Sequence, residues 1–389
     1  MTSPFCFDPL DLPPTCAPLR REVRAFLADV APTWSGWDVG HSWTAFDRDF
    51  TREVARRGWI GMVWPKRYGG HERSAMERYV VMEELLAAGS PVGAHWVADR
   101  QSGPLLLKVG SEAQRQRFLP MIVRGEAAFC IGLSEPDAGS DLASLRSRAT
   151  KVEGGWRLNG RKVWTTYAQQ CDFMIGLFRT GGADKAKHDG LSQFLIDLRS
   201  SGLSIHPIRD LTGEAHFNEV VFDDVFVPDD LLVGQENEGW RQVNSELAYE
   251  RSGPDRYLSS FPLLPQVIDA VKAALPPGQE ADRLASRRVG TAAAEMTVLR
   301  EMSLSILGQL AQGGMPAQEA AVTKLLGTDF EQRLPALARE LCEGPAVHAG
   351  DARLASMASY LTQAAPTFSL RGGTNEIMRG IVARGLGVR

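Results

Sequence analysis

The chain has 389 residues, with 43 lysines and arginines against 47 aspartates and glutamates, giving a formal net charge of −4 at pH 7. This balance provides no strong positive field, so we expect no binding to nucleic acid. The sequence contains no apolar run of about 18 residues, the minimum for a membrane-spanning helix, and its opening MTSPFCFDPLDLPPT lacks the basic and apolar regions of a secretory signal. We therefore expect a cytoplasmic protein of two or three packed domains with no membrane span.

Residues 1–125 are expected to form an α-helical domain. The stretches LRREVRAFLADV, AFDRDFTREVARRGW and AMERYVVMEELLAAG carry apolar residues at spacings of three and four, which is typical of helices with one buried face. Turn-forming residues such as Trp64-Pro65 and Gly69-Gly70 separate these stretches.

The periodicity changes in residues 126–235, which predicts a β domain. DFMIGLFRT, LSQFLIDL and FNEVVFDDVFVP are strand-length runs bounded by Gly, Asp or Pro. In WRLNGRKVW, alternating residues flank Asn159-Gly160, a pair that favours a two-residue hairpin turn. We therefore predict a hairpin centred on Asn159-Gly160.

Helical patterns return in residues 236–389. The long amphipathic stretches ASRRVGTAAAEMTVLREMSLSILGQLAQGG and EAAVTKLLGTDFEQRLPALARELC are typical of helices that pack as an antiparallel bundle. Pro276 to Gln279 predict an exposed turn between two bundle helices.

Five segments occur in an order and wording that resemble the acyl-CoA dehydrogenase family over nearly the whole chain. They are GWIGMVWPKRYGG, IGLSEPDAGSDLA, NGRKVWTT, FNEVVFDDVFVP and RGGTNEIMR. The resemblance implies an α+β multidomain fold with an N-terminal α-helical domain, a central β-barrel or sandwich domain and a C-terminal four-helix bundle. It also implies FAD lying between the β domain and the bundle.

The resemblance also implies which residues contact FAD. One segment lies along the flavin and its pyrophosphate, a second packs on the isoalloxazine ring, and a third lies just ahead of a helix whose first amides suit an anion. The residues are Leu133, Ser134 and Ser140; Trp164, Thr165 and Thr166; and Thr374, Asn375 and Glu376. Without the motifs, Trp164 would be read as a core aromatic and Thr374 as an ordinary helix cap.

Oxidation of an acyl thioester requires a carboxylate that removes the α-proton and hydrogen bonds to the thioester carbonyl. Many members of the family carry this glutamate just before the Gly-Thr of the C-terminal motif, where this chain has Gly372. Members resembling isovaleryl-CoA and long-chain dehydrogenases carry it on the first bundle helix before an arginine. LAYERSG places Glu250 and Arg251 there, so we assign Glu250 as the base. The alternative is a solvated pair with Glu246 or an ion pair with a nearby arginine.

The resemblance places Ser140, Arg251, Gly372 and Gly373 near the substrate, and the Gly372 N–H is expected to polarise the thioester carbonyl. Arg100 is a candidate for contacting a polar substrate tail, with a structural ion pair as the alternative. The seven histidines show no metal-binding spacing, so we expect no metal.

The family usually carries a segment resembling Arg-Lys-Thr-Phe-Gly and a Gly-Gly-Asn-Gly turn, both of which reach the FAD of a neighbouring subunit. This chain has neither in the corresponding PPGQEADRLASRRVG and CEGPAVHAGDARLAS. The assembly is therefore either a homo-oligomer (dimer or tetramer) with different contacts or a heteromer with a related subunit.

The leading hypothesis is FAD-dependent α,β-dehydrogenation of an acyl-CoA or carrier-bound acyl thioester, with electrons passed to an electron-transfer flavoprotein. One alternative is a non-catalytic or partial-site subunit of a heteromeric acyl-CoA dehydrogenase. Another is a flavin oxidase or monooxygenase of the same superfamily, which reactivity with oxygen would distinguish.

Overall fold

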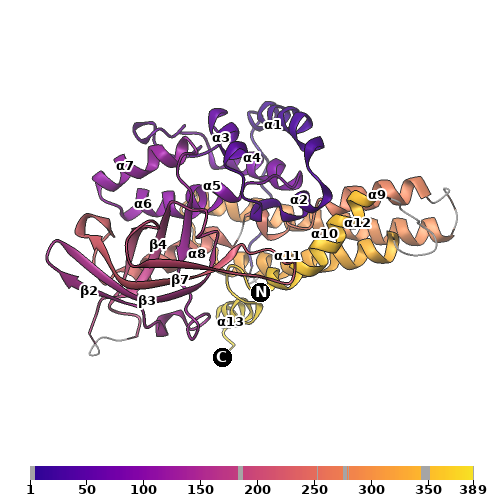
Figure 1. The fold of residues 1–389 in the computed structure, drawn as a ribbon. Helices are drawn as coiled ribbons and strands as arrows, with labels where there is room; N and C mark the ends of the chain where they lie inside the picture. The colour runs from indigo at the N-terminus through magenta and orange to yellow at the C-terminus, as the bar shows by residue number, and fades with distance from the viewer. Residues whose placement is uncertain are drawn as a thin grey trace. The chain divides into compact units, whose positions relative to one another are not determined.

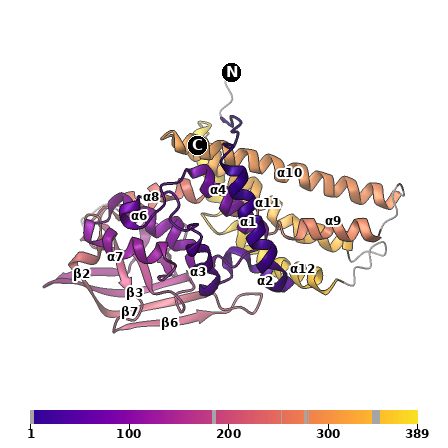
Figure 2. The same cartoon turned by 90° about the horizontal axis from the view of Figure 1, so that it is seen from above.

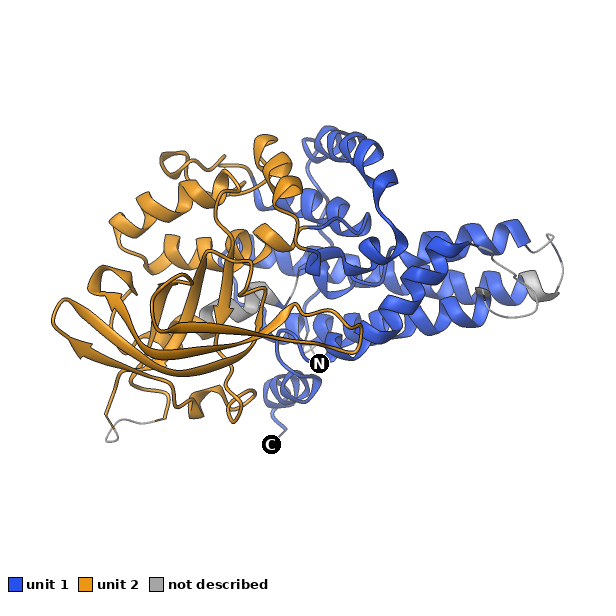
Figure 3. Cartoon of the chain, viewed as in Figure 1, with its two compact units in different colours: residues 1–45, 74–91, 248–389 blue, residues 46–73, 92–247 orange. Residues whose placement is uncertain are grey.

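The computed structural model describes residues 5–182, 187–251, 253–274, 278, 280–342 and 351–388; for residues 245–250, 280–282 and 342 it describes the backbone alone. The chain divides into two compact units (Figure 3). The helical unit contains residues 1–45, 74–91 and 248–389, and the sheet unit contains residues 46–73 and 92–247. The boundaries predicted near residues 125 and 235 stay predictions.

The helical unit begins with three helices: α1 (Cys16–Val30), α2 (Gly36–His41) and α4 (Ala75–Ala87). Ser35 and Ser74 start α2 and α4 with capping boxes, in which each serine hydroxyl accepts a backbone N–H three residues later. Arg20 of α1 pairs with Glu83 of α4 at 2.8 Å. The helical periodicity predicted for α1 and α4 is confirmed.

Four further helices of this unit pack against one another: α9 (Leu263–Ala274), α10 (Glu280–Ala311), α11 (Ala317–Cys342) and α12 (Ala352–Ala364). Figures 1 and 2 show them side by side in both views. Buried side chains including Leu263, Val267, Met357 and Leu361 form their core, as the predicted bundle requires. A last helix, α13 (Asn375–Gly385), packs on α11. The turn predicted at Pro276–Gln279 lies outside the described residues, apart from Gly278.

The sheet unit combines four short helices with one sheet. The helices are α3 (Arg48–Arg56), α5 (Gly93–Val97), α6 (Gly103–Val109) and α7 (Glu112–Val123). The strands are β1 (Phe129–Gly132), β2 (Arg148–Val152), β3 (Gly155–Thr166), β4 (Phe173–Arg179), β5 (Leu191–Asp197), β6 (Leu203–Ile208), β7 (Phe217–Pro228) and β8 (Leu232–Val233). Helix α8 (Gly239–Glu250) contains the boundary between the two units.

The strand order is β6-β7-β3-β2-β4-β5-β8, and β1 pairs in parallel with β4. Strands β4 and β5 are buried at every position except their last, which explains why DFMIGLFRT and LSQFLIDL are apolar without strict alternation. The predicted strands are confirmed, as is the order helix, sheet, helix. Among the described residues, no helix has both the length and the apolar composition needed to cross a membrane.

The hairpin predicted at Asn159-Gly160 is wrong, because β3 runs through both residues. The turn between β2 and β3 instead lies at Glu153-Gly154, with Val152 paired to Gly155. Gly160 has a φ of +137°, and a Cβ there would lie 2.3 Å from the Ser147 hydroxyl. The glycine therefore allows the register shift in β3 and the close approach of Ser147. Short-range turn statistics cannot detect either feature.

Candidate functional site

The first group of predicted site residues lies in the sheet unit, where a buried ion pair ties the loop after β1 to strand β3. The Lys162 ammonium has no exposed surface and donates to the Glu135 carboxylate at 2.8 Å and to the Leu133 carbonyl at 3.1 Å. Glu135 also accepts the backbone N–H groups of Arg146 and Ser147 at 2.6 and 2.9 Å. The segment containing Leu133 and Ser134 is thus fixed from both sides.

The pair is ionised at neutral pH. Burial lowers the pKa of Lys162 to about 8, although the neighbouring Glu135 raises it. Burial alone would raise the pKa of Glu135, but the Lys162 ammonium holds it below its ordinary value. Two charges that are buried together and fully hydrogen-bonded can both remain ionised.

Trp164 is held outward by an irregularity in β3. Lys162 and Thr165 are both buried. Their residue numbers differ by an odd number, and in a regular strand such residues point to opposite faces of the sheet, so regular alternation cannot bury both on one face. A register shift between Lys162 and Thr165 resolves this conflict, and Trp164 adopts a φ of +62°. Such strain in a non-glycine residue is uncommon and is found mostly at functional sites. The indole is 58% exposed and contacts Phe217 edge-on.

The neighbouring hydroxyls differ in their surroundings. Thr165 is 1% exposed, and its Oγ1 finds no hydrogen-bond partner in the part of the chain that the structure describes. Thr166, Leu133 and Ser134 are half-buried, whereas Ser140 is exposed. Arg100 is half-buried, with its guanidinium 5.1 Å from the Trp96 ring centre. The adjacent Asp99 carboxylate accepts the Gly61 N–H at 2.7 Å.

The second group lies in the helical unit, around the turn at Gly372-Gly373. Both glycines have a left-handed backbone, with φ of +68° and +96°. Arg251, which follows α8, is 9% exposed and donates its Nε–H to the Gly372 carbonyl at 3.1 Å. Arg251, the residue after Glu250, is thereby connected to the C-terminal motif. The Glu250 side chain itself lies outside the described residues.

Arg371 anchors the same turn from its other side. Its Nη2 donates to the Glu331 carboxylate at 2.5 Å, to the Ser259 hydroxyl at 2.8 Å and to the Asp255 carbonyl at 3.0 Å. The Glu331 side chain has no exposed surface and also accepts the Ser259 N–H at 2.8 Å. Arg371 therefore satisfies a buried carboxylate and fixes the start of the turn.

Thr374, Asn375 and Glu376 begin α13. The Thr374 hydroxyl caps the helix by accepting the Ile377 N–H at 3.3 Å. Asn375 Oδ1 accepts from Lys324 Nζ at 3.0 Å, and burial together with Arg256 and Arg371 lowers the pKa of Lys324 to about 8. Glu376 is exposed, and its pKa is lowered by its own backbone N–H and the Thr374 hydroxyl.

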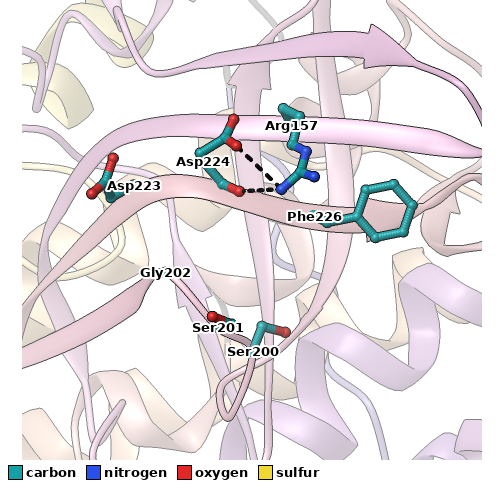
Figure 4. A pocket seen from close by; sticks show the side chains of 7 residues that line it. All are labelled: Arg157, Ser200, Ser201, Gly202, Asp223, Asp224 and Phe226. Carbon is teal, nitrogen blue, oxygen red and sulfur yellow. Dashed lines mark hydrogen bonds and ion pairs between the residues drawn. The ribbon is translucent and has the colours of Figure 1, made fainter.

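A cavity of about 410 Å³ also opens in the sheet unit, and Figure 4 shows its lining. Arg157 donates to the Asp224 carbonyl at 2.8 Å and lies 3.2 Å from its carboxylate, so these two charges neutralise each other and Asp223 adds a second carboxylate to the lining. The lining residues are Arg157, Ser200, Ser201, Gly202, Asp223, Asp224 and Phe226. None of them belongs to the predicted site.

Comparison with known proteins decides the family. Residues 14–126, 130–225 and 237–387 match the N-terminal, middle and C-terminal domains of acyl-CoA dehydrogenase, respectively. Acyl-CoA dehydrogenase FadE29 of Mycobacterium tuberculosis is 33% identical over 384 residues, covering 96% of this chain and 97% of that relative. The chain belongs to the acyl-CoA dehydrogenase family. Members of this family are flavoproteins that oxidise acyl-CoA substrates.

Two solved structures share the fold along nearly the whole chain. One is described as "Tcur3481-Tcur3483 steroid ACAD", with a TM-score of 0.84 and 28% identity, covering 98% of this chain and 100% of that chain. The other is the ChsE4-ChsE5 complex from Mycobacterium tuberculosis, with a TM-score of 0.81 and 28% identity, covering 98% of this chain and 99% of that chain.

Residues of the sheet unit fit the flavin that the family implies. Trp164 presents a flat aromatic surface, and the Thr165 hydroxyl has no hydrogen-bond partner among the described residues, which suits a ring with polar edges. Sequence reasoning missed the pair Glu135–Lys162 and the cation Arg256. The sequence does contain a signal for a buried charge at Lys162, because this lysine interrupts the strand-like run that leads to Trp164. Arg256 lies outside every motif.

Proposed function

We propose that this chain dehydrogenates an acyl-CoA between its α and β carbons, with Glu250 as the base. The observation that carries this proposal is the hydrogen bond from Arg251 Nε to the Gly372 carbonyl. It joins the residue after Glu250 to the turn where many relatives carry their catalytic glutamate. The proposed base on α8 would then replace the glutamate that many members carry at position 372, where this chain has a glycine.

Within this proposal, the Glu250 carboxylate takes the α-proton, and the Gly372 N–H donates to the thioester carbonyl as negative charge develops there. Bound FAD would supply the hydride acceptor that oxidation at the β-carbon requires. The residues proposed to contact the flavin, as the family resemblance implies, are Leu133, Ser134, Ser140, Trp164, Thr165, Thr166, Thr374, Asn375 and Glu376. Arg100, Ser140, Arg251 and Gly373 would orient the substrate.

The first test is a visible spectrum of the purified protein, followed by anaerobic addition of acyl-CoAs from short and branched to aromatic and steroid-like. We expect a flavin spectrum that is bleached by one class of acyl-CoA. Retention of the flavin spectrum with every acyl-CoA would argue against dehydrogenation, and rapid reoxidation by oxygen would favour the oxidase alternative.

The base assignment has its own test. Glu250→Gln keeps the shape of the side chain but removes the proton acceptor, so flavin reduction should slow by roughly 10²-fold or more, the usual contribution of a general base. FAD content and the melting temperature should stay at wild-type values. Wild-type reduction rates in this variant would assign the base to another residue.

A second proposal concerns assembly. We infer a heteromer with a related subunit, because the chain lacks the two inter-subunit segments and because two similar structures carry paired names, Tcur3481-Tcur3483 steroid ACAD and ChsE4-ChsE5 complex. The first of these names also favours a steroid-like acyl group. A colourless protein that gains flavin only when co-expressed with such a subunit would support the heteromer. A yellow homo-oligomer that reduces an electron-transfer flavoprotein by itself would contradict it.

A further inference from the structure

Gly372 lies directly against the guanidinium of Arg256. A Cβ added at Gly372 would lie 3.0 Å from both Cζ and Nη2 of Arg256 and 3.2 Å from Nη1, distances that require the arginine to move. The positive φ of Gly372 adds a second penalty for any side chain. The guanidinium therefore fills the space beside position 372 that a side chain would need.

Arg256 is fixed at both of its ends. It lies in the short turn Pro254–Arg256, where its carbonyl packs so closely on α11 that a Cβ at Gly327 would lie 2.2 Å from it. Its side chain is 4% exposed, and Nε lies 3.2 Å from the Asp255 carboxylate. The Nε edge thus faces Asp255, and the Nη atoms face Gly372.

The other charged groups around Gly372 come from several elements of the helical unit. Arg251 follows α8, Arg371 precedes the turn, and Lys324 lies on α11; the carboxylates are Asp255, Glu331 and, at the surface, Glu376. On α4, which packs against the Pro254–Arg256 turn, Glu83 is bonded to Arg20 and Arg300. Burying a guanidinium costs several kcal/mol unless it is paired, and Asp255 supplies a buried carboxylate for Arg256.

We propose that Arg256 is an electrostatic residue of the dehydrogenation site, whose charge beside Gly372 stabilises the negative charge that develops on the thioester oxygen. This inference rests on the proposed function. Members of the family with a glutamate at position 372 have an anion at that position. This chain instead has the Arg256 cation beside Gly372, and its proposed base is Glu250. As the α C–H bond breaks, the proton passes to the base and the electron pair moves toward the carbonyl, where the positive charge lowers its energy.

The test measures charge on the bound ligand without turnover. The probe is the 3-thia analogue of whichever acyl-CoA bleaches the wild-type flavin, because this analogue loses its acidic α-proton and its anion gives a long-wavelength absorption with bound flavin. The apparent pKa of the bound analogue is measured in wild type, Arg256→Gln and Arg256→Lys. Arg333→Gln removes an exposed cation of the same unit and controls for net charge.

We expect Arg256→Gln to raise the apparent pKa of the analogue by about one unit, a tenfold loss of anion at a fixed pH, and Arg256→Lys and Arg333→Gln to change it little. If Arg256→Gln binds no flavin, Arg256→Met replaces it, since methionine keeps an unbranched side chain without the charge and should also raise the pKa. If a variant of Arg256 that lacks the charge still binds flavin and leaves the pKa of the bound analogue unchanged, the role of Arg256 is overturned while the proposed function stands. A wild-type protein that no acyl-CoA bleaches overturns the proposed function and this inference together.

Discussion

The two units bury charge in different ways. In the sheet unit, Lys162 and Glu135 form a one-to-one pair whose remaining bonds go to backbone groups. In the helical unit, Arg251 and Arg256 lie against the backbone of a glycine turn. The first arrangement fixes a loop to a strand. The second brings positive charge beside Gly372, where we propose that it acts on the substrate.

The largest effect should come from breaking the pair in the sheet unit. Lys162→Met leaves the buried Glu135 carboxylate without the hydrogen bond from the lysine Nζ, so the free energy of unfolding should fall by about 3 kcal/mol, the cost of leaving a buried charged group without its partner. Chemical denaturation measures this. The double variant Lys162→Met with Glu135→Gln removes both charges and should recover most of the loss. A single variant as stable as wild type would mean that the pair does not hold the loop.

The same pair predicts a pH dependence of stability. The folded-state pKa of Lys162 is about 8 against an ordinary value of 10.5, so the unfolded chain binds the proton more tightly between these values. The contribution of Lys162 to stability therefore rises with pH across that window, and its penalty is fully present below pH 8. Unfolding of wild type and the double variant at pH 7 to 10 should show a difference that grows in favour of wild type. A constant difference would contradict the assignment.

A smaller effect should follow from a methyl group on α11. In Gly327→Ala the new Cβ would lie 2.2 Å from the Arg256 carbonyl, so overpacking should cost about 1–3 kcal/mol. Gly290→Ala on α10 is the matched control, because a Cβ there meets no atom within 4 Å and should stabilise the helix by about 0.5–1 kcal/mol. Thermal unfolding of both variants compares them. Equal effects would show that the close contact at Arg256 is easily relieved.

The sequence by itself determined the order of helices and strands, because apolar periodicity records which face of each segment is buried. Five ordered motifs in the sequence also identified the family. The sequence further showed that position 372 is a glycine, which departs from the pattern of many members. The roles assigned to Glu250 and to the flavin-binding residues stay predictions, since they rest on resemblance to those motifs.

Only the tertiary structure decided the contacts between residues far apart in the chain. Asn159-Gly160 has the local signature of a hairpin, yet Gly160 is needed inside a strand because Ser147 packs against it. Nothing near Arg256 in the sequence indicates that its guanidinium lies against Gly372. Local patterns report burial and backbone preference, whereas the partner of a buried charge is chosen by how the elements pack.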